Sequence, residues 1–256
     1  LKILIIKKIN NNKNTSVLAE VRLGIVTIIV GLSVNFVKCV LREEDDYDLL
    51  AHCFTIAFIR VLILAIFGKI KMPKITHNEK ATELRFQAMN EIFGDIIPVK
   101  KQGQTHIWFT PWDYLIRWWV VQEAMMDLIL RPDMVHAFYE KMVQAWMIEL
   151  DQFEQQNLLS LDCTNTRIGT GGYGYTKEMP GDNFNPNHIK PQNMWGCSNA
   201  QIFSDVSPEM HWEFAIEHDL KWLERFNMTY YGCCEPLAGK GHLLKQIPNL
   251  RKVSCS

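Results

Sequence analysis

The chain has 256 residues, 48% of them hydrophobic, and a formal net charge of −1 because 27 Lys and Arg nearly balance 28 Asp and Glu. Such a composition is typical of a globular protein with one sizeable core and gives no reason to expect intrinsic disorder or two equal domains. It lacks the basic excess that drives nucleic-acid binding, so nucleic acid is not an expected partner.

The first part of the chain, residues 1–70, differs from the rest. Leu23–Leu41 and Cys53–Phe67 are nearly continuous apolar runs, and the first is long enough to cross a bilayer. Asn35 and Lys38 interrupt it. Three interpretations compete: a membrane anchor, buried elements of the fold, or a non-native leader from a wrong reading frame. We expect the last, and therefore regard a membrane as an unlikely partner.

Residues 71–256 form the second region, where Thr76 and Glu79 have the spacing of a capping box that opens a helix. The helix is expected to end at Gly94 and to carry five apolar residues on one face: Ala81, Leu84, Ala88, Met89 and Ile92. Ile96–Val99 follows as a short buried strand.

Helices and strands then alternate. Residues 122–130 are expected to be helical, and Pro132 suits the first position of a long helix that reaches about Asn157. Leu158–Asp162 is predicted as a strand, and the long Gly- and Asn-rich loop 163–193 is interpreted as a mobile substrate loop.

The remaining elements, in chain order, are a strand end at Ala200–Phe203, a helix capped by Ser207 and running to Phe226, a strand at Met228–Gly232, a helix at His242–Gln246 and a strand at Arg251–Cys255. This alternation predicts a parallel sheet with right-handed crossovers. Because no helix follows the last strand, we expect the chain to be incomplete.

The candidate site lies at the end of the strand Met228–Gly232, where Cys233, Cys234 and Glu235 follow directly. Two thiols and a carboxylate at a strand end suggest a catalytic metal or an activated thiolate. Successive strand residues face opposite ways, so at most one of the two cysteines is expected to point into the site. The alternative is a buried Cys beside a structural Gly.

Two further segments carry polar candidates. Asp162, at the end of its predicted strand, and Asn165, just after it, are positioned to meet a substrate, although Asp162 could equally cap the following turn. The Trp-rich segment 108–119 is either core or the wall of an aromatic pocket, with His106 and Asp113 as its polar groups. The seven cysteines form no plausible disulfide framework, which indicates a reducing, cytoplasmic setting.

The region from about Pro73 to Ser256 resembles the uroporphyrinogen decarboxylase superfamily, in the decarboxylase-like branch near the corrinoid-dependent methyltransferases. The segments that carry the resemblance are DQFEQQNLLSLD at Asp151–Asp162, MWGCSNAQIFSDVSPEMHWEF at Met194–Phe214, YYGCCEPL at Tyr230–Leu237 and IPNLRKVSCS at Ile247–Ser256. The resemblance implies an α/β fold, a partial TIM (β/α)8 barrel.

The resemblance also implies a site. In the methyltransferases of this family, a zinc ion held by a His-x-Cys pair and a later Cys activates a thiol. The pair matches Tyr231 and Cys233 here, so the His is replaced, and Cys234 or Glu235 would substitute as a ligand.

The implied function is transfer of a methyl group between a small methylated substrate, or a corrinoid carrier on a partner protein, and an acceptor. Asp162 and Glu235 are the candidate catalytic residues, Cys233 and Cys234 the candidate zinc ligands. The candidate substrate-binding residues are Trp112, Asn165, Gln201 and Tyr231. The alternatives are a cofactor-free porphyrinogen decarboxylase, with Asp162 in the electrostatic role, and a catalytically inactive or membrane-tethered binding protein.

Overall fold

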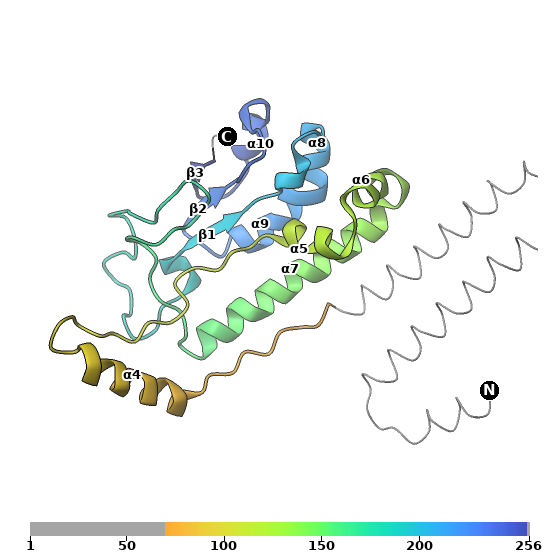
Figure 1. Cartoon of the computed structure of the whole chain (residues 1–256). Helices are drawn as coiled ribbons and strands as arrows, with labels where there is room; N and C mark the ends of the chain where they lie inside the picture. The colour runs from red at the N-terminus through yellow and green to blue at the C-terminus, as the bar shows by residue number, and fades with distance from the viewer. Residues whose placement is uncertain (1–69, 255–256) are drawn as a thin grey trace, which may run out of the picture. The chain divides into compact units, whose positions relative to one another are not determined.

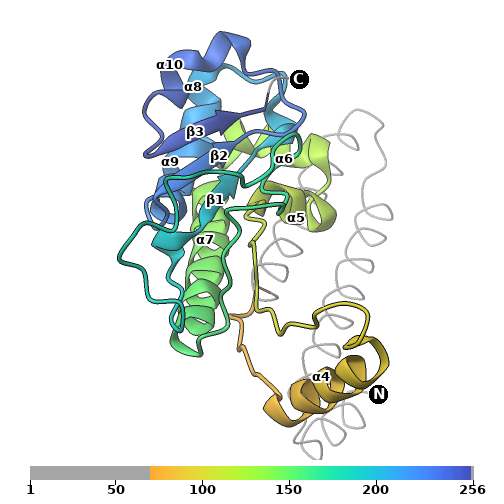
Figure 2. The same cartoon turned by 90° about the vertical axis from the view of Figure 1, so that its left-hand side faces the viewer.

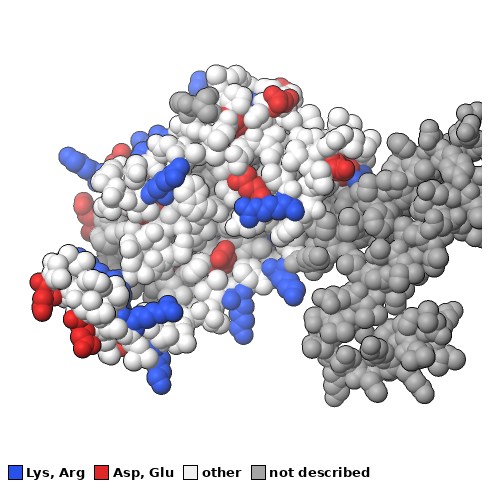
Figure 3. Space-filling view, in the orientation of Figure 1, with Lys and Arg blue, Asp and Glu red and all other residues white. Residues whose placement is uncertain are grey.

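The computed structural model describes residues 70–254, which belong to the second of two units in the chain, Ile70–Ser256 (Figure 1). The expected leader and both long apolar runs, residues 1–69, lie outside the described residues. On the face that Figure 3 shows, Lys and Arg side chains lie among Asp and Glu side chains, as the balanced composition leads one to expect.

The centre of the fold is a three-stranded parallel sheet in the order β1 (Trp195–Ser198), β2 (Met228–Tyr231), β3 (Leu250–Val253). Trp195 pairs with Met228, and Thr229 pairs with Leu250. The predicted parallel sheet is therefore confirmed for these three strands. Whether they form part of a TIM barrel stays a prediction.

Helices cover one face of the sheet. Ser198 on β1 donates to Asp219 of α9 (Glu217–Leu223), and α9 in turn packs against the long helix α7 (Pro132–Gln155). Figure 1 shows α7 and α9 beside the strands. The remaining helices of the described part are α4 (Glu79–Phe93), α5 (Pro111–Trp118), α6 (Val121–Leu130), α8 (Pro208–His211) and α10 (Gly241–Leu244).

The long loop 163–193 covers the other face of the sheet. Its apolar side chains share one buried cluster with residues of β1 and β2: Cys163, Ile168, Met179, Trp195, Cys197, Met228 and Tyr230. At Gly169 a Cβ atom would lie 2.3 Å from the Tyr230 ring, so only glycine lets the loop come this close. In this structure the glycines of the loop let it pack on the sheet.

Several sequence-based predictions of elements are confirmed. Pro132 is the first residue of α7, the helix predicted at 122–130 is α6, and β2 occupies Met228–Tyr231. Ser207 caps α8 by accepting the Met210 N–H, and the helix continues through a π-helical turn, Trp212–Ile216, into α9. The predicted helix to Phe226 therefore ends at Leu223.

The prediction for the start of the second region is wrong about the residue that caps the helix. Asn78, not Thr76, is the N-cap of α4, because its side chain accepts the Ala81 N–H. The apolar stripe of α4 is not buried: no residue of this helix is buried, and Leu84 and Ile92 are exposed. Figure 2 shows α4 apart from the sheet.

Three predicted strands are also wrong. The backbone N–H groups of Ile96 and Ile97 both donate to the Phe93 carbonyl, so this segment is a turn, and its side chains are exposed. Within residues 70–254, Leu158–Asp162 makes one isolated parallel bridge, from Leu159 to Gln104, and is not a strand. Gln201–Phe203 is a 3-10 turn after β1.

Candidate functional site

Three side chains from distant parts of the chain form a thiol–imidazole–carboxylate group, here called the Cys197 cluster (Cys197, His106, Asp162). His106 Nε2 lies 3.2 Å from the Cys197 sulfur, and His106 Nδ1 lies 3.1 Å from Asp162 Oδ2. The Trp195 N–H donates to both Asp162 oxygens at 3.0 and 3.1 Å. A backbone group at the start of β1 thus holds the carboxylate that orients the imidazole.

The Cys197 cluster is buried: Cys197 is 3% exposed, His106 4% and Asp162 0%. Burial lowers the pKa of His106, but attraction to the Cys197 sulfur and hydrogen bonding to Asp162 outweigh it and raise that pKa to about 10. Burial raises the pKa of Asp162, and the His106 contact opposes this shift. At neutral pH His106 is therefore protonated and donates from both nitrogens, to Asp162 and to the sulfur.

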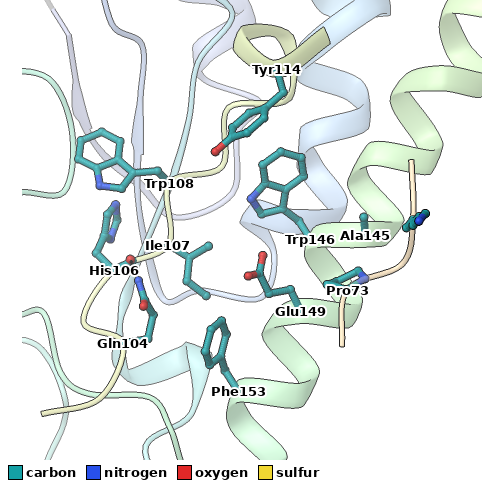
Figure 4. A pocket seen from close by; sticks show the side chains of 11 residues that line it. Pro73, Gln104, His106, Ile107, Trp108, Tyr114, Ala145, Trp146, Glu149 and Phe153 are labelled. Carbon is teal, nitrogen blue, oxygen red and sulfur yellow. Dashed lines mark hydrogen bonds between the residues drawn. The ribbon is translucent and has the colours of Figure 1, made fainter. Parts of the chain in front are cut away.

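A pocket of about 360 Å³ lies next to this cluster (Figure 4). His106 and Ile107 are part of its wall, and the Cys197 sulfur lies 3.6 Å from the Ile107 carbonyl oxygen. The remaining lining residues are Lys71, Pro73, Gln104, Trp108, Tyr114, Ala145, Trp146, Glu149 and Phe153. The sulfur therefore lies directly behind the pocket wall.

A second polar group lies at the carboxyl ends of β1 and β2. Glu235 is fully buried and accepts the Ala200 N–H at 3.0 Å and the Cys233 N–H at 2.8 Å. The Cys233 thiol lies 3.5 Å from Gln201 Oε1, and Gln201 Nε2 donates to Asp113 at 2.8 Å. The structure thus brings together Gln201, Cys233 and Glu235 of the predicted site residues.

The two adjacent cysteines do not point in opposite directions as predicted, since their sulfurs lie 3.5 Å apart. The strand has ended at Tyr231, and Gly232 has a φ of 100°, which turns the chain before the cysteines. The alternation rule for strands therefore does not apply to them.

The donor set at this edge does not fit a zinc ion. The Glu235 oxygens face backbone N–H groups, so Cys233 and Cys234 have no third ligand there. Within residues 70–254, no three His, Cys, Asp or Glu side chains are grouped so that they could hold a metal. A structural or catalytic zinc site needs at least three protein ligands.

The other predicted site residues lie elsewhere. Tyr231 is on the helix-covered face, where its hydroxyl lies 2.8 Å from His211 Nε2. Trp112 is fully buried in the core and donates from Nε1 to the Phe214 carbonyl at 2.9 Å. Asn165 is exposed in the loop after Asp162. None of these three side chains lines the pocket beside His106.

The two predicted catalytic carboxylates contact opposite ends of β1. Asp162 binds the N–H of Trp195 and Glu235 binds the N–H of Ala200. The four residues of β1 lie between these two contacts, and four extended residues span roughly 13 Å. The structure therefore separates the single predicted site into two groups.

His211, on the helix-covered face, is neutral. Burial first, and then the nearby Lys240 ammonium, lower its pKa to about 3. Lys240 is buried and donates from Nζ to His211 Nδ1 at 2.9 Å and to the Phe203 carbonyl at 2.8 Å. Nε2 of His211 must then carry the ring proton and donate to the Tyr231 oxygen.

Cys197 was not singled out from the sequence. It lies 91 positions from His106, and Asp162 lies 56 positions from His106, so no local motif joins the three residues. The useful signal was the polar His106 beside a Trp-rich segment. The partners of His106 follow only from the fold, which brings Cys197 of β1 next to the segment that carries His106.

Comparison with known proteins identifies no family. No protein-family model matches the chain, and no solved structure matches it. A curated protein described as "Uncharacterized transporter YcxC", from Bacillus subtilis (strain 168), is 44% identical over 46 residues. Those residues are 18% of this chain and 15% of that protein. In residues 70–254, no helix has both the length and the apolar character needed to cross a membrane.

Proposed function

We propose that this protein is a group-transfer enzyme that moves a methyl group from a small methylated compound to an acceptor, with Cys197 as the nucleophile. The supporting observation is the Cys197 cluster, in which an imidazolium contacts the sulfur at 3.2 Å and a carboxylate orients the imidazolium. A thiol beside a charged, oriented imidazole is the arrangement by which proteins activate a sulfur nucleophile.

In this reaction the proton of the Cys197 thiol is held on His106 Nε2, the sulfur electron pair attacks the methyl carbon, and a bond between sulfur and carbon forms. The bond from carbon to nitrogen or oxygen breaks, and its electron pair leaves with the amine or the oxygen. An amine derived from a methylated ammonium departs neutral, whereas an oxygen leaving group takes the proton from His106 Nε2. Transfer of the methyl group to the acceptor then restores the sulfur.

Zinc has no part in this proposal, because Cys233, Cys234 and Glu235 do not converge on a metal position. A corrinoid carrier on a partner protein as the acceptor, and a cytoplasmic setting, are parts of the proposal that rest on the family resemblance. Decarboxylation of a porphyrinogen has less support, because the Asp162 oxygens already receive the Trp195 N–H and His106.

The test is covalent labelling of the full chain with methyl iodide at neutral pH, with the methylated cysteines located by mass spectrometry. We expect Cys197 to be methylated at least about tenfold faster than Cys163. Cys163 is the matched control, because it is buried with Cys197 in the apolar cluster between the long loop and the sheet. Burial raises the pKa of Cys163 to about 11.

The same experiment includes the His106→Gln variant, whose fold is checked by circular dichroism. Cys197 should lose its advantage over Cys163 in this variant. Equal rates at the two cysteines in the parent chain, or an unchanged Cys197 rate in the variant, would contradict the proposal. Turnover of a porphyrinogen without any requirement for Cys197 would favour the decarboxylase, and absence of both activities would favour a binding protein.

A further inference from the structure

We propose that the pocket beside His106 binds a small organic cation, a methylated ammonium group, between its aromatic rings and the Glu149 carboxylate. Figure 4 shows Trp108, Tyr114 and Trp146 around the pocket, with Glu149 and Phe153 completing the wall. Aromatic rings around a cavity, together with one carboxylate, are features of sites that recognise quaternary ammonium ligands.

The aromatic walls come from two parts of the fold. Trp108 lies two residues after His106, and Tyr114 lies on α5, which follows. Trp146 lies on α7. The Tyr114 and Trp146 rings meet edge to face at 5.3 Å between centroids, which fixes the angle between two walls. Trp108 is 42% exposed although it borders a cavity, which leaves part of its ring open to a ligand.

Glu149 is held in the pocket by helix geometry. It follows Trp146 by three positions and precedes Phe153 by four, so all three side chains lie on the same face of α7. Burial raises the pKa of Glu149. No Lys, Arg or His in residues 70–254 forms an ion pair with it. A partly buried carboxylate without a cationic partner is stabilised when a cationic ligand binds.

Two basic side chains line the pocket, and a third, Arg117, lies over the Tyr114 ring at 4.9 Å from its centroid, so a cation already occupies one face of that ring. Lys71 is exposed, so solvent screens its charge. His106 is charged, but its two nitrogens are directed at Asp162 and Cys197 and its ring meets Trp108 edge to face at 5.3 Å. Glu149 is therefore the acidic group among the pocket residues that a ligand can reach.

As a methyl donor, such a cation would be separated from the Cys197 sulfur by His106 and Ile107, and this part of the pocket wall would have to open before transfer. This link to catalysis rests on the proposed function, whereas cation binding does not. A methylated ammonium would carry an electrophilic methyl carbon and leave as a neutral amine, which suits a sulfur nucleophile. The pocket would thus select the donor by charge and by the size of its methyl groups.

The test is a ligand-observed NMR titration of the full chain with tetramethylammonium at pH 8, and with neopentyl alcohol as a neutral compound of similar shape. We expect tetramethylammonium to bind at least about tenfold more tightly than the alcohol. The variants Glu149→Gln and Trp108→Ala should each weaken its binding by about fivefold or more.

Matched controls are Trp118→Ala, since Trp118 is also 42% exposed but lies outside the pocket, and Glu91→Gln on the exposed helix α4. Both should leave binding unchanged. Equal binding of the neutral alcohol, no binding of tetramethylammonium, or equal losses in the control variants would overturn the proposal. Binding is measured without turnover, so a failure of Cys197 methylation leaves this result interpretable, and a failure of binding leaves the labelling result intact.

Discussion

Two buried histidines lie on opposite faces of the sheet, and one is positively charged while the other is neutral. His106, on the face covered by the long loop, has its pKa raised to about 10, and His211, on the face covered by helices, has its pKa lowered to about 3. Both side chains are nearly inaccessible to solvent. The difference comes from the neighbours, a carboxylate and a sulfur in one case and an ammonium in the other.

Burial alone therefore does not decide whether a histidine is charged. Desolvation lowers the pKa of both rings, and only His106 has acceptors on both nitrogens that reverse the effect. The chain thus places a charged imidazole where chemistry is proposed and a neutral imidazole where it joins structural elements. Four changes test this contrast.

The largest effect is expected from Asp162→Ala, which removes the carboxylate that stabilises the His106 charge. The variant leaves the Trp195 N–H without its acceptor and an imidazolium without its counterion, at a cost of about 3–5 kcal/mol in unfolding free energy. Urea denaturation at pH 7 measures the loss. Asp182→Ala, at an exposed position, is the control and should change stability little.

The second change, Lys240→Met, alters the environment of His211. It removes the ammonium but keeps the aliphatic stem, and it leaves the Phe203 carbonyl and His211 Nδ1 without their donor. We expect a loss of about 1–3 kcal/mol in unfolding free energy. The pKa of His211, followed by NMR, should rise. Lys245→Met, at an exposed position, is the control and should change neither the unfolding free energy nor the pKa of His211. If the pKa of His211 is the same in Lys240→Met as in the parent chain, Lys240 does not lower it.

The pH dependence of stability should have limbs of opposite sign. The contribution of His106, whose folded-state pKa is raised, is complete below its ordinary value of 6.5 and is lost as the pH rises towards 10. That of His211, whose folded-state pKa is depressed, is complete above 6.5 and is lost as the pH falls towards 3. Each proton contributes up to about 1.4 kcal/mol per pH unit.

These two contributions should combine into maximal stability near pH 6.5. Urea midpoints between pH 4 and pH 9 measure the profile. The His211→Gln variant should flatten the acid limb and leave the alkaline limb unchanged. An alkaline limb that disappears together with the acid limb would mean that His106 does not produce it.

The smallest effect is expected from Tyr231→Phe, which removes only the phenol oxygen that His211 contacts at 2.8 Å. The loss of one buried hydrogen bond should cost about 0.5–1.5 kcal/mol. Tyr175→Phe, at an exposed position, is the matched control. If the two substitutions had equal effects in thermal or urea unfolding, the Tyr231 hydroxyl would have no part in holding His211.

Sequence reasoning succeeded where the signal was local and periodic. Pro132 and the helical stripe that follows predicted α7, and the short apolar run before Gly232 predicted β2. It failed for β1, because Trp195–Ser198 is buried on both faces and shows no alternation that would mark a strand. The apolar stripe of α4 shows a related limit, since periodicity predicts which residues share a face and not whether a partner covers that face.

The candidate site was predicted only in part, because some of its contacts join residues that are close in sequence and others join residues that are far apart. Cys233 and Glu235 are close in sequence and do lie together, whereas Cys197 meets His106 across 91 positions. Such a contact depends on which extended segments become neighbours in the fold. Asp162 was identified by its place at the end of an extended segment, but its hydrogen bond to Trp195 could not be read from that place.

The exposure of α4 has a consequence for the cooperativity of the fold. A helix of 15 residues is marginal in water by itself, and α4 gains no support from buried side chains. Its opening should therefore require far less free energy than global unfolding, while α7, with six buried residues, opens with the core. In hydrogen exchange the amides of α4 should exchange within the earliest time points, long before those of α7.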